Sequence, residues 1–285
     1  MKLAVISDIH GNYIALQKCL EYALSQGVET FLFLGDYHGE LAYPRRTMDI
    51  LYALHEKYTC YFIRGNKEDY WNSYKQRGEK GWEYQNSTTG SLLYTYENLT
   101  ETDFAFLTTL PAVQSIAFPN LPAITACHGS PRKTNEKMLP GVDATYDLME
   151  QDANSLILCG HTHVQREIEH SGKRVLNPGS VGVPKDSGGK SQFMILNGDD
   201  GTWYHEFVSL DYDVERVIAE LYEEELHIKA PYWCKVTEHL LRTGEEAHGA
   251  VLARAMQLCT EKTGECRWPN IPERCWEQAV KEMVG

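Results

Sequence analysis

Seven polar residues among the first 163 have the types and spacing of a metal site assembled from separate loops. They are Asp8, His10, Asp36, Asn66, His128, His161 and His163, in the segments ISDIHGN, FLGDYHG, IRGNKED, ACHGSP and CGHTHV. This mixture of carboxylates, imidazoles and one amide suits a pair of divalent transition-metal ions better than a structural zinc. A carboxylate such as Asp36 can bridge two ions. Ions about 3.5–4 Å apart can activate a shared hydroxide and hold the oxygens of a phosphoryl group.

Each of these segments directly follows an apolar stretch rich in β-branched or aromatic residues. Open α/β sheets place their ligands at the carboxyl ends of such strands. A single GD or GN pair is weak evidence, because these pairs are common in turns. The GHTH segment is stronger, since alternate histidines after a strand rarely serve packing. One site would explain all five segments, and we therefore favour a single metal centre.

The sequence predicts a β-α-β-α-β unit at the N-terminus. Apolar spacing indicates strands at 2–6, 30–34 and 59–63 and helices at 13–26 and 44–57. Such an alternation implies parallel strands joined by right-handed crossovers.

The remainder of the chain divides into three parts. Residues 67–110 are rich in aromatic and hydroxyl side chains and are expected to form helical pieces and loops. Further strands are predicted at 112–118, 121–127, 155–159, 164–169, 173–176, 192–197 and 202–208, the first two as a hairpin. Residues 210–285 read as a helical extension without metal-type motifs, beside a main domain at 1–209. This extension could cap the site, mediate dimerisation or extend the core.

Composition restricts the classes of function. The net charge of −13 argues against nonspecific nucleic-acid binding through a basic face. No apolar run approaches the ~20 residues of a membrane span, and MKLAVISDIH reads as a first strand, not a signal peptide. We therefore expect a cytoplasmic protein whose eight cysteines are reduced. A structural zinc on Cys234, Cys259, Cys266 and Cys275 is a less favoured alternative, because zinc sites prefer short paired spacings.

The order D-x-H, GD, GN, an H before G, and GHTH resembles the calcineurin-like metallophosphoesterase superfamily. The later NPGSVG at 177–182 is similar to the YfcE-type, phosphodiesterase-like branch. The resemblance covers about residues 1–208 and implies an α/β fold, a four-layer αββα sandwich of two mixed sheets flanked by helices. It also implies two divalent ions. Manganese, iron and zinc all suit the ligand set, with manganese favoured. By the same resemblance, Asp8, His10 and His163 bind one ion, Asn66, His128 and His161 bind the other, and Asp36 bridges them.

One departure from the family pattern concerns the proton donor. Many members have GNH[DE], and this chain has Lys67 where that histidine stands. The lysine could stabilise charge on the phosphate or, with a lowered pKa, donate a proton. The alternative is a surface lysine paired with Glu68 or Asp69. Asn12 follows the DIHG turn and is expected near the phosphoryl oxygens. The predicted catalytic residues are thus Asn12, Lys67 and His128.

These features predict an enzyme that hydrolyses phosphoester or phosphoanhydride bonds with a bridging hydroxide at a dinuclear site. Without a histidine donor, diesters, anhydrides and activated aryl esters are favoured over alkyl monoesters. A dinucleoside polyphosphate hydrolase is the alternative enzyme, and a non-catalytic protein-binding scaffold is the alternative of another class. The partner is a small phosphorylated substrate. A nucleotide is considered because rings in the segment 70–96 could stack a base, although packing of the insertion or a homo-oligomer contact is favoured for them.

Overall fold

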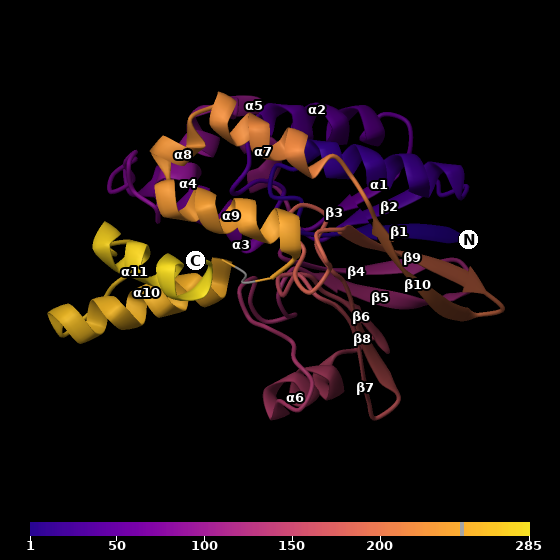
Figure 1. The fold of residues 1–285 in the computed structure, drawn as a ribbon. Coiled ribbons are helices and arrows are strands. Elements are labelled where there is room, and N and C mark those ends of the chain that lie inside the picture. The colour runs from indigo at the N-terminus through magenta and orange to yellow at the C-terminus, as the bar shows by residue number, and fades with distance from the viewer. Residues whose placement is uncertain (246–247) are drawn as a thin grey trace.

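The first sheet contains the N-terminal β-α-β-α-β unit that the sequence predicts. In the computed structural model, which describes residues 1–245 and 248–285, β1 (Lys2–Ile6), β2 (Thr30–Phe33) and β3 (Thr59–Phe62) pair in parallel. Helices α1 (Tyr13–Ser25) and α2 (Pro44–His55) return the chain over one face (Figure 1). The antiparallel strands β9 (Ser191–Asp199) and β10 (Thr202–Leu210) complete the order β10-β9-β1-β2-β3.

The second sheet has the order β4-β5-β6-β8-β7. Its strands are β4 (Val113–Phe118), β5 (Leu121–Cys127), β6 (Leu156–Leu158), β7 (Gln165–His170) and β8 (Lys173–Pro178). The three central strands run parallel, and β4 and β7 pair antiparallel at the two edges. The hairpin between β4 and β5 is confirmed, and Asn120 in its turn adopts a left-handed φ of 59°.

Apolar side chains fill the space between the two sheets. Val5, Leu32, Ile124 and Leu176 belong to this central cluster and are fully buried. The other face of the first sheet packs on α1 and α2. The other face of the second sheet packs on α6 (Asp143–Gln151), whose Met149 is buried with Ile157. The predicted four-layer sandwich of two mixed sheets is therefore confirmed. Helix α6 was not predicted from the sequence, and only two of its residues, Thr145 and Met149, are buried.

The segment after β3 is helical, as predicted. It forms α3 (Asn66–Gln76), α4 (Gly90–Glu97) and α5 (Glu101–Thr108). Most of its aromatic rings pack on one another. Tyr74 stacks on Trp82 with centroids 3.9 Å apart, and Tyr96 meets Tyr74 edge-on at 5.0 Å. Most of these rings therefore pack within the insertion, as expected. Tyr70 is an exception, because its ring lies beside Trp268.

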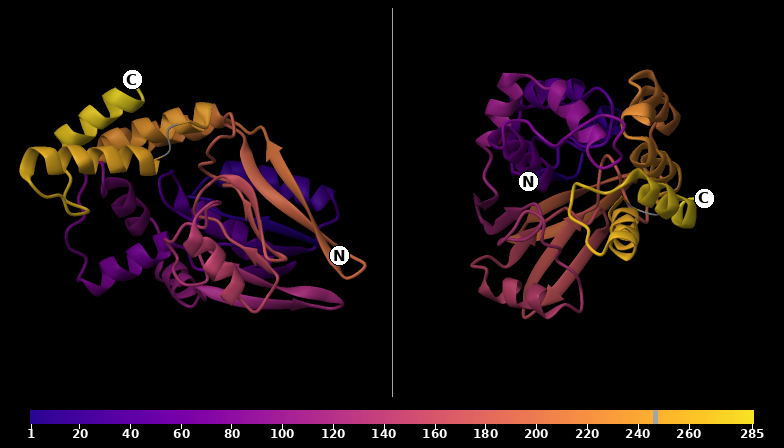
Figure 2. Two further views of the ribbon diagram at one scale, coloured as in Figure 1. Left: turned by 90° about the horizontal axis from the view of Figure 1, so that it is seen from below. Right: turned by 90° about the vertical axis from the view of Figure 1, so that its left-hand side faces the viewer.

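Five helices follow β10 and lie along one side of the sandwich (Figures 1 and 2). They are α7 (Val214–Glu223), α8 (Leu226–Lys229), α9 (Pro231–Thr243), α10 (His248–Thr263) and α11 (Glu273–Met283). Leu221 of α7 packs with Leu41 and Tyr94. Glu273 of α11 accepts hydrogen bonds from the backbone and hydroxyl of Ser87, at 2.8 and 2.7 Å. The extension is therefore joined both to the main body and to the insertion.

The structure bears on two expectations, which concern membrane-spanning helices and the cysteines. Among the described helices, none combines the length and apolar character needed to cross a bilayer. The described cysteines are all free thiols, and Cys234, Cys259, Cys266 and Cys275 do not enter either of the metal-type clusters found in the described residues. The less favoured structural zinc is thus not supported.

Candidate metal centre

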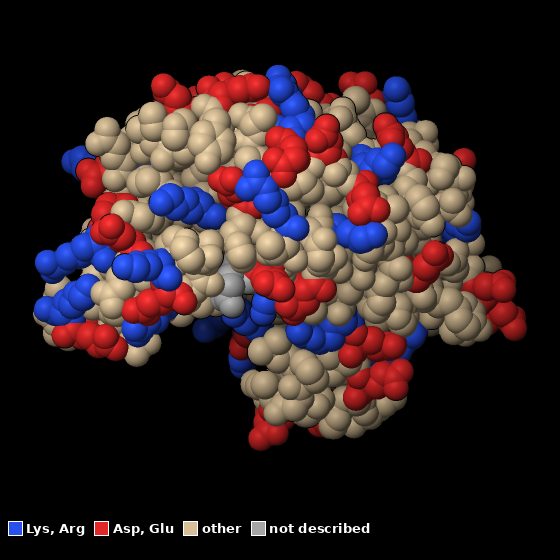
Figure 3. Space-filling view, in the orientation of Figure 1, with Lys and Arg blue, Asp and Glu red and all other residues tan. Residues whose placement is uncertain are grey.

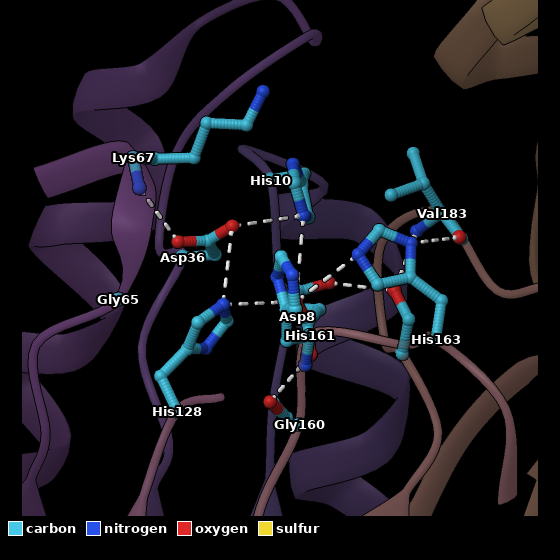
Figure 4. Close-up of polar contacts among 12 residues, drawn as sticks. Asp8, His10, Asp36, Gly65, Lys67, His128, Gly160, His161, His163 and Val183 are labelled. Carbon is cyan, nitrogen blue, oxygen red and sulfur yellow. Dashed lines mark hydrogen bonds and ion pairs between the residues drawn. The ribbon is translucent and has the colours of Figure 1, made fainter. Parts of the chain in front are cut away.

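The seven candidate ligands converge at one edge of the sandwich, beyond the carboxyl ends of five strands. Asp8 and His10 follow β1, Asp36 follows β2, and Asn66 begins α3 after β3. His128 follows β5, and His161 and His163 follow β6 (Figure 4). Five of the seven have left-handed backbone, with φ of 54° at Asp8, 53° at His10, 53° at Asp36, 65° at His161 and 59° at His163. Non-glycine residues pay a conformational cost there, and such strain concentrates at functional sites.

Each aspartate uses one oxygen for anchoring and turns the other inward. Oδ2 of Asp8 accepts hydrogen bonds from Oγ of Ser7 at 2.5 Å and from the backbone N–H of His161 at 3.0 Å. Oδ1 of Asp8 is buried and receives no hydrogen bond from the described residues. Oδ1 of Asp36 accepts from the backbone N–H of Lys67 at 2.8 Å, which leaves Oδ2 toward the histidines. Both carboxylates are therefore preoriented toward a common centre.

Three of the histidines are anchored through Nδ1 and turn Nε2 inward. Nδ1 of His128 lies 2.7 Å from the carbonyl oxygen of Leu34, and Nδ1 of His163 lies 3.0 Å from that of Val183. Nδ1 of His10 contacts the carboxylate of Glu40. Metal-binding histidines are typically held in this way, because a partner on one nitrogen fixes the tautomer and directs the other.

The inward atoms form two overlapping clusters. Ligand atoms of Asp8, His10 and His163 lie within 4.8 Å of one another, as do those of Asp8, Asp36 and His128. Oδ1 of Asn66 lies 3.1 Å from Nε2 of His128 and extends the second cluster. Oδ1 of Asp8 and Nε2 of His10 are buried without hydrogen-bond partners among the described residues. Burial of such atoms is costly unless something binds them, and a cation suits this donor set.

His161 is placed differently from the other six. Its ring meets that of His128 edge-on with centroids 5.3 Å apart, and it belongs to neither cluster. Asp8 is common to both clusters, whereas the family resemblance assigns the bridging position to Asp36.

Electrostatic attraction between the carboxylates and the histidines also holds the two clusters together. Burial lowers the pKa of His10, but the charge of Glu40 and the close approach of the Asp8 and Glu40 carboxylates outweigh it and raise that pKa to about 10. Burial likewise opposes protonation of His128, whose pKa the charges of Asp36 and Asp8 raise to about 9. Burial raises the pKa of Asp8, but the charges of His163 and His128 prevail and hold it well below its usual range. Protonated histidines thus offset the negative charge of the carboxylates, as a bound dication would.

Lys67 is not the surface lysine of the alternative interpretation. Its side chain is buried, and Nζ lies 2.5 Å from Oε1 of Glu40, a residue that sequence reasoning missed. Glu68 instead accepts hydrogen bonds from the backbone N–H groups of Asp36 and Gly65, at 3.0 and 2.8 Å. Pairing of Lys67 with Glu68 or Asp69 is therefore wrong. The only available signal for Glu40 was its place four residues after Asp36.

Both polar atoms of the Asn12 side chain have partners within the protein. Its Oδ1 accepts from the backbone N–H of Ala15 at 3.0 Å and caps α1, and its Nδ2 donates to the carbonyl of Gly182 at 3.0 Å. It is absent from the lining of the cavity above the centre. Asn12 thus helps to hold the loop after β1, and its catalytic role stays a prediction. Ser180 of the NPGSVG segment acts similarly, because its hydroxyl donates to the carbonyl of Asp8 at 2.8 Å.

A cavity of about 560 Å³ opens onto the metal centre. His10, Asp36, Asn66 and Lys67 form its floor together with His161 and His163. The insertion contributes Tyr70 and Leu92, and the C-terminal helices and the segment before α11 contribute Trp233, His248, Leu252 and Trp268. Figure 3 shows a hollow in the surface between α10 and the lobe that carries α6, with basic side chains at its margin. The helical extension therefore builds part of the wall of this cavity.

The fold and the ligand geometry define a class of protein, and comparison with known proteins identifies it. Residues 1–201 match the model of the calcineurin-like phosphoesterase superfamily domain, and the chain belongs to that family. An uncharacterized protein of Methanocaldococcus jannaschii is 26% identical over 250 residues, which are 81% of this chain and 94% of that protein.

Two solved structures share the fold. A hypothetical protein of Pyrococcus horikoshii superposes with a TM-score of 0.71 at 21% identity, covering 86% of this chain and 99% of that one. A metallophosphoesterase from Sphaerobacter thermophilus superposes with a TM-score of 0.63 at 22% identity, covering 82% and 100%. The predicted superfamily is confirmed, and the chain is a metal-dependent phosphoesterase, a hydrolase.

Proposed function

We propose that this enzyme hydrolyses phosphodiester or phosphoanhydride bonds at a centre of two divalent ions. The supporting observation is the pair of overlapping ligand clusters in which Oδ1 of Asp8 and Nε2 of His10 are buried and have no hydrogen-bond partner in the described part of the chain. Asp8, His10 and His163 would hold one ion, and Asp36, Asn66, His128 and His161 would hold the other. When bound, the ions would supply Lewis-acid stabilisation of the phosphoryl oxygens and would lower the pKa of the attacking water.

The protein's own residues orient the metal ligands and stabilise negative charge on the substrate. The carboxylate of Glu40 holds the ring of His10 and the ammonium of Lys67 together, so the positions of a ligand and a cation are coupled. Burial lowers the pKa of Lys67, but the charges of Glu40 and Asp36 outweigh it and raise that pKa above its usual value. We assign Lys67 to stabilising negative charge on the phosphoryl group. An enzyme without a strong acid at this position favours leaving groups that need little protonation, which agrees with diesters and anhydrides.

The test combines metal analysis with hydrolysis of bis(p-nitrophenyl) phosphate. Asp36→Asn and His128→Ala should each lose bound metal and lower kcat/KM by at least about 100-fold, on the scale of removing a group that stabilises the transition state. Asp49→Asn is the matched control, because Asp49 is exposed and pairs only with Arg45 at 3.0 Å. Titrating metal-free protein with Mn²⁺, Fe²⁺ and Zn²⁺ identifies the active ion, for which we propose manganese. Wild-type turnover in either variant at saturating metal would refute the assignment.

A further inference from the structure

The cavity above the metal centre has two chemically different ends. Lys185 lies at the His163 end, since its backbone N–H donates to the carbonyl of His163 at 2.9 Å, and Arg166 follows three residues after His163. Tyr70 lies at the Asn66 end, one helical turn along α3, and its ring is 5.3 Å from that of Trp268. His163 belongs to the first ligand cluster and Asn66 lies beside His128 of the second, so the two ends adjoin different clusters.

The cationic end lacks the acidic partners that basic groups usually have. Within the described chain, Arg166 has no carboxylate within 4.0 Å, and Lys185 reaches only Asp186, at 4.0 Å. Nη1 of Arg166 is buried and has no hydrogen-bond partner there. A buried guanidinium nitrogen without an acceptor is costly, and an anionic ligand would satisfy it.

The aromatic end offers flat apolar surface and an unused donor. Tyr70 and Trp268 are each partly exposed and line the cavity. The nearby indole of Trp233 stacks on His248 with centroids 4.5 Å apart, and its Nε1 is buried without a partner among the described residues. A planar ring that carries acceptor atoms fits such a wall, because base–aromatic stacking tolerates any flat π-face.

We propose that the substrate is a nucleoside polyphosphate, with its base at Tyr70 and Trp268 and its distal phosphate at Arg166 and Lys185. This inference rests on the proposed function, since the phosphoryl group between those parts lies over the metal centre. Hydrolysis then breaks the P–O bond to the distal phosphate. The water oxygen bonds to phosphorus, its proton passes to the departing phosphate, and no other reactant is needed.

Binding of three ligands to Mn²⁺-loaded protein tests the two ends separately. We would measure dissociation constants by calorimetry, in excess free Mn²⁺, for ribose 5-phosphate, AMP and the non-hydrolysable α,β-methylene analogue of ADP. The base should tighten binding about tenfold between the first two ligands. The distal phosphate should tighten it about tenfold again between the second and third.

Each variant should remove one of these two differences in affinity. Trp268→Leu should abolish the difference between AMP and ribose 5-phosphate and preserve the difference between AMP and the ADP analogue. The double variant Arg166→Gln with Lys185→Gln should preserve the difference between AMP and ribose 5-phosphate and abolish the difference between AMP and the ADP analogue. Trp233→Leu gives a second test of the aromatic end if Trp268→Leu does not fold. Tyr204→Leu, at a site 58% exposed, and Lys190→Gln, at a surface lysine paired with Asp211, are the matched controls and should change neither step.

Equal binding of all three ligands would overturn the inference, as would variants that weaken every ligand by the same factor. If the protein binds all three ligands equally and still hydrolyses bis(p-nitrophenyl) phosphate with metal, this inference alone is refuted. Stepwise binding by a protein that hydrolyses nothing would instead refute the proposed function and retain the ligand class.

Discussion

At the scale of single residues, Glu40 connects a metal ligand to the cation that replaces the family's usual histidine. Its carboxylate is buried, contacts Nδ1 of His10 and lies 2.5 Å from Nζ of Lys67. Glu40→Gln should therefore weaken metal binding about 10–100-fold, the usual cost of losing a partner behind a ligating histidine. It should also destabilise the protein by about 3 kcal/mol, because Lys67 remains buried without its counter-charge.

Metal titration followed by calorimetry and urea unfolding measures both effects. Glu21→Gln is the control, since Glu21 is exposed and lies 3.9 Å from Lys18 at the surface. Unchanged metal affinity in Glu40→Gln would show that the ring of His10 does not depend on this carboxylate.

Lys67 allows the roles of charge and proton donor to be separated. If it stabilises charge only, Lys67→Met should lower kcat for p-nitrophenyl and phenyl diesters by a similar factor, about 10–100-fold, on the lower part of the scale for removing one electrostatic group. A general acid would matter more for the poorer leaving group, because that group needs its proton in the transition state. Rates with both esters distinguish the two. A clearly larger loss for the phenyl ester would make Lys67 the acid.

Sequence reasoning located the seven polar residues that the structure brings together, because each stands at a strand end and strand ends share an edge. It could not find Glu40, since a lone glutamate after a GD pair has no distinctive pattern. It predicted Asn12 near the substrate from its position after the DIHG turn, but the sequence does not give the direction of this side chain. In the structure Asn12 caps α1 and holds Gly182.

At the scale of elements, the loop after β6 approaches the loop after β1 too closely for a side chain. A methyl group on residue 160 would lie 1.9 Å from Oγ of Ser7 and 2.6 Å from Oδ2 of Asp8. Gly160→Ala should therefore displace Asp8, reduce bound metal and destabilise the fold by about 1–3 kcal/mol, the usual cost of overpacking.

Metal analysis and thermal unfolding test the effect of Gly160→Ala. In Gly249→Ala the added methyl meets nothing within 4 Å on α10, so this control should be neutral or slightly stabilising. Full metal content in Gly160→Ala would mean that the two loops can separate without harm to the site.

The elements themselves were predictable where periodicity is strong. The parallel unit β1 to β3 and the hairpin of β4 and β5 were found, whereas α6, in which only Thr145 and Met149 are buried, was not predicted. The C-terminal helices were expected, and capping of the site was one of three roles left open for them; α9 and α10 do line the cavity above the candidate centre. Docking of α11 through Glu273 and Ser87, 186 residues apart, is a long-range contact that no local pattern encodes.

At the scale of the whole molecule, the metal centre links the two sheets, since Asp8 and Asp36 follow strands of one and His128 and His163 follow strands of the other. A bound ion that contacts both should stabilise the entire fold. Removing it with a chelator should lower the free energy of unfolding by about 2.7 kcal/mol per site occupied at 100 times Kd. The melting temperature should fall by about 5 °C or more.

The size of this metal effect should grow with pH. In the metal-free protein the pKa values of His10 and His128 are raised from 6.5 to about 10 and about 9. A raised folded-state pKa gives stability that is complete below 6.5 and is lost as the pH rises through the folded value. Metal binding needs the neutral rings, so it gains as those protons leave. The melting difference between loaded and metal-free protein should widen from pH 6.5 to 9, as differential scanning calorimetry can measure. His128→Ala should reduce the widening, and a difference that stays constant or narrows would contradict proton displacement at these histidines.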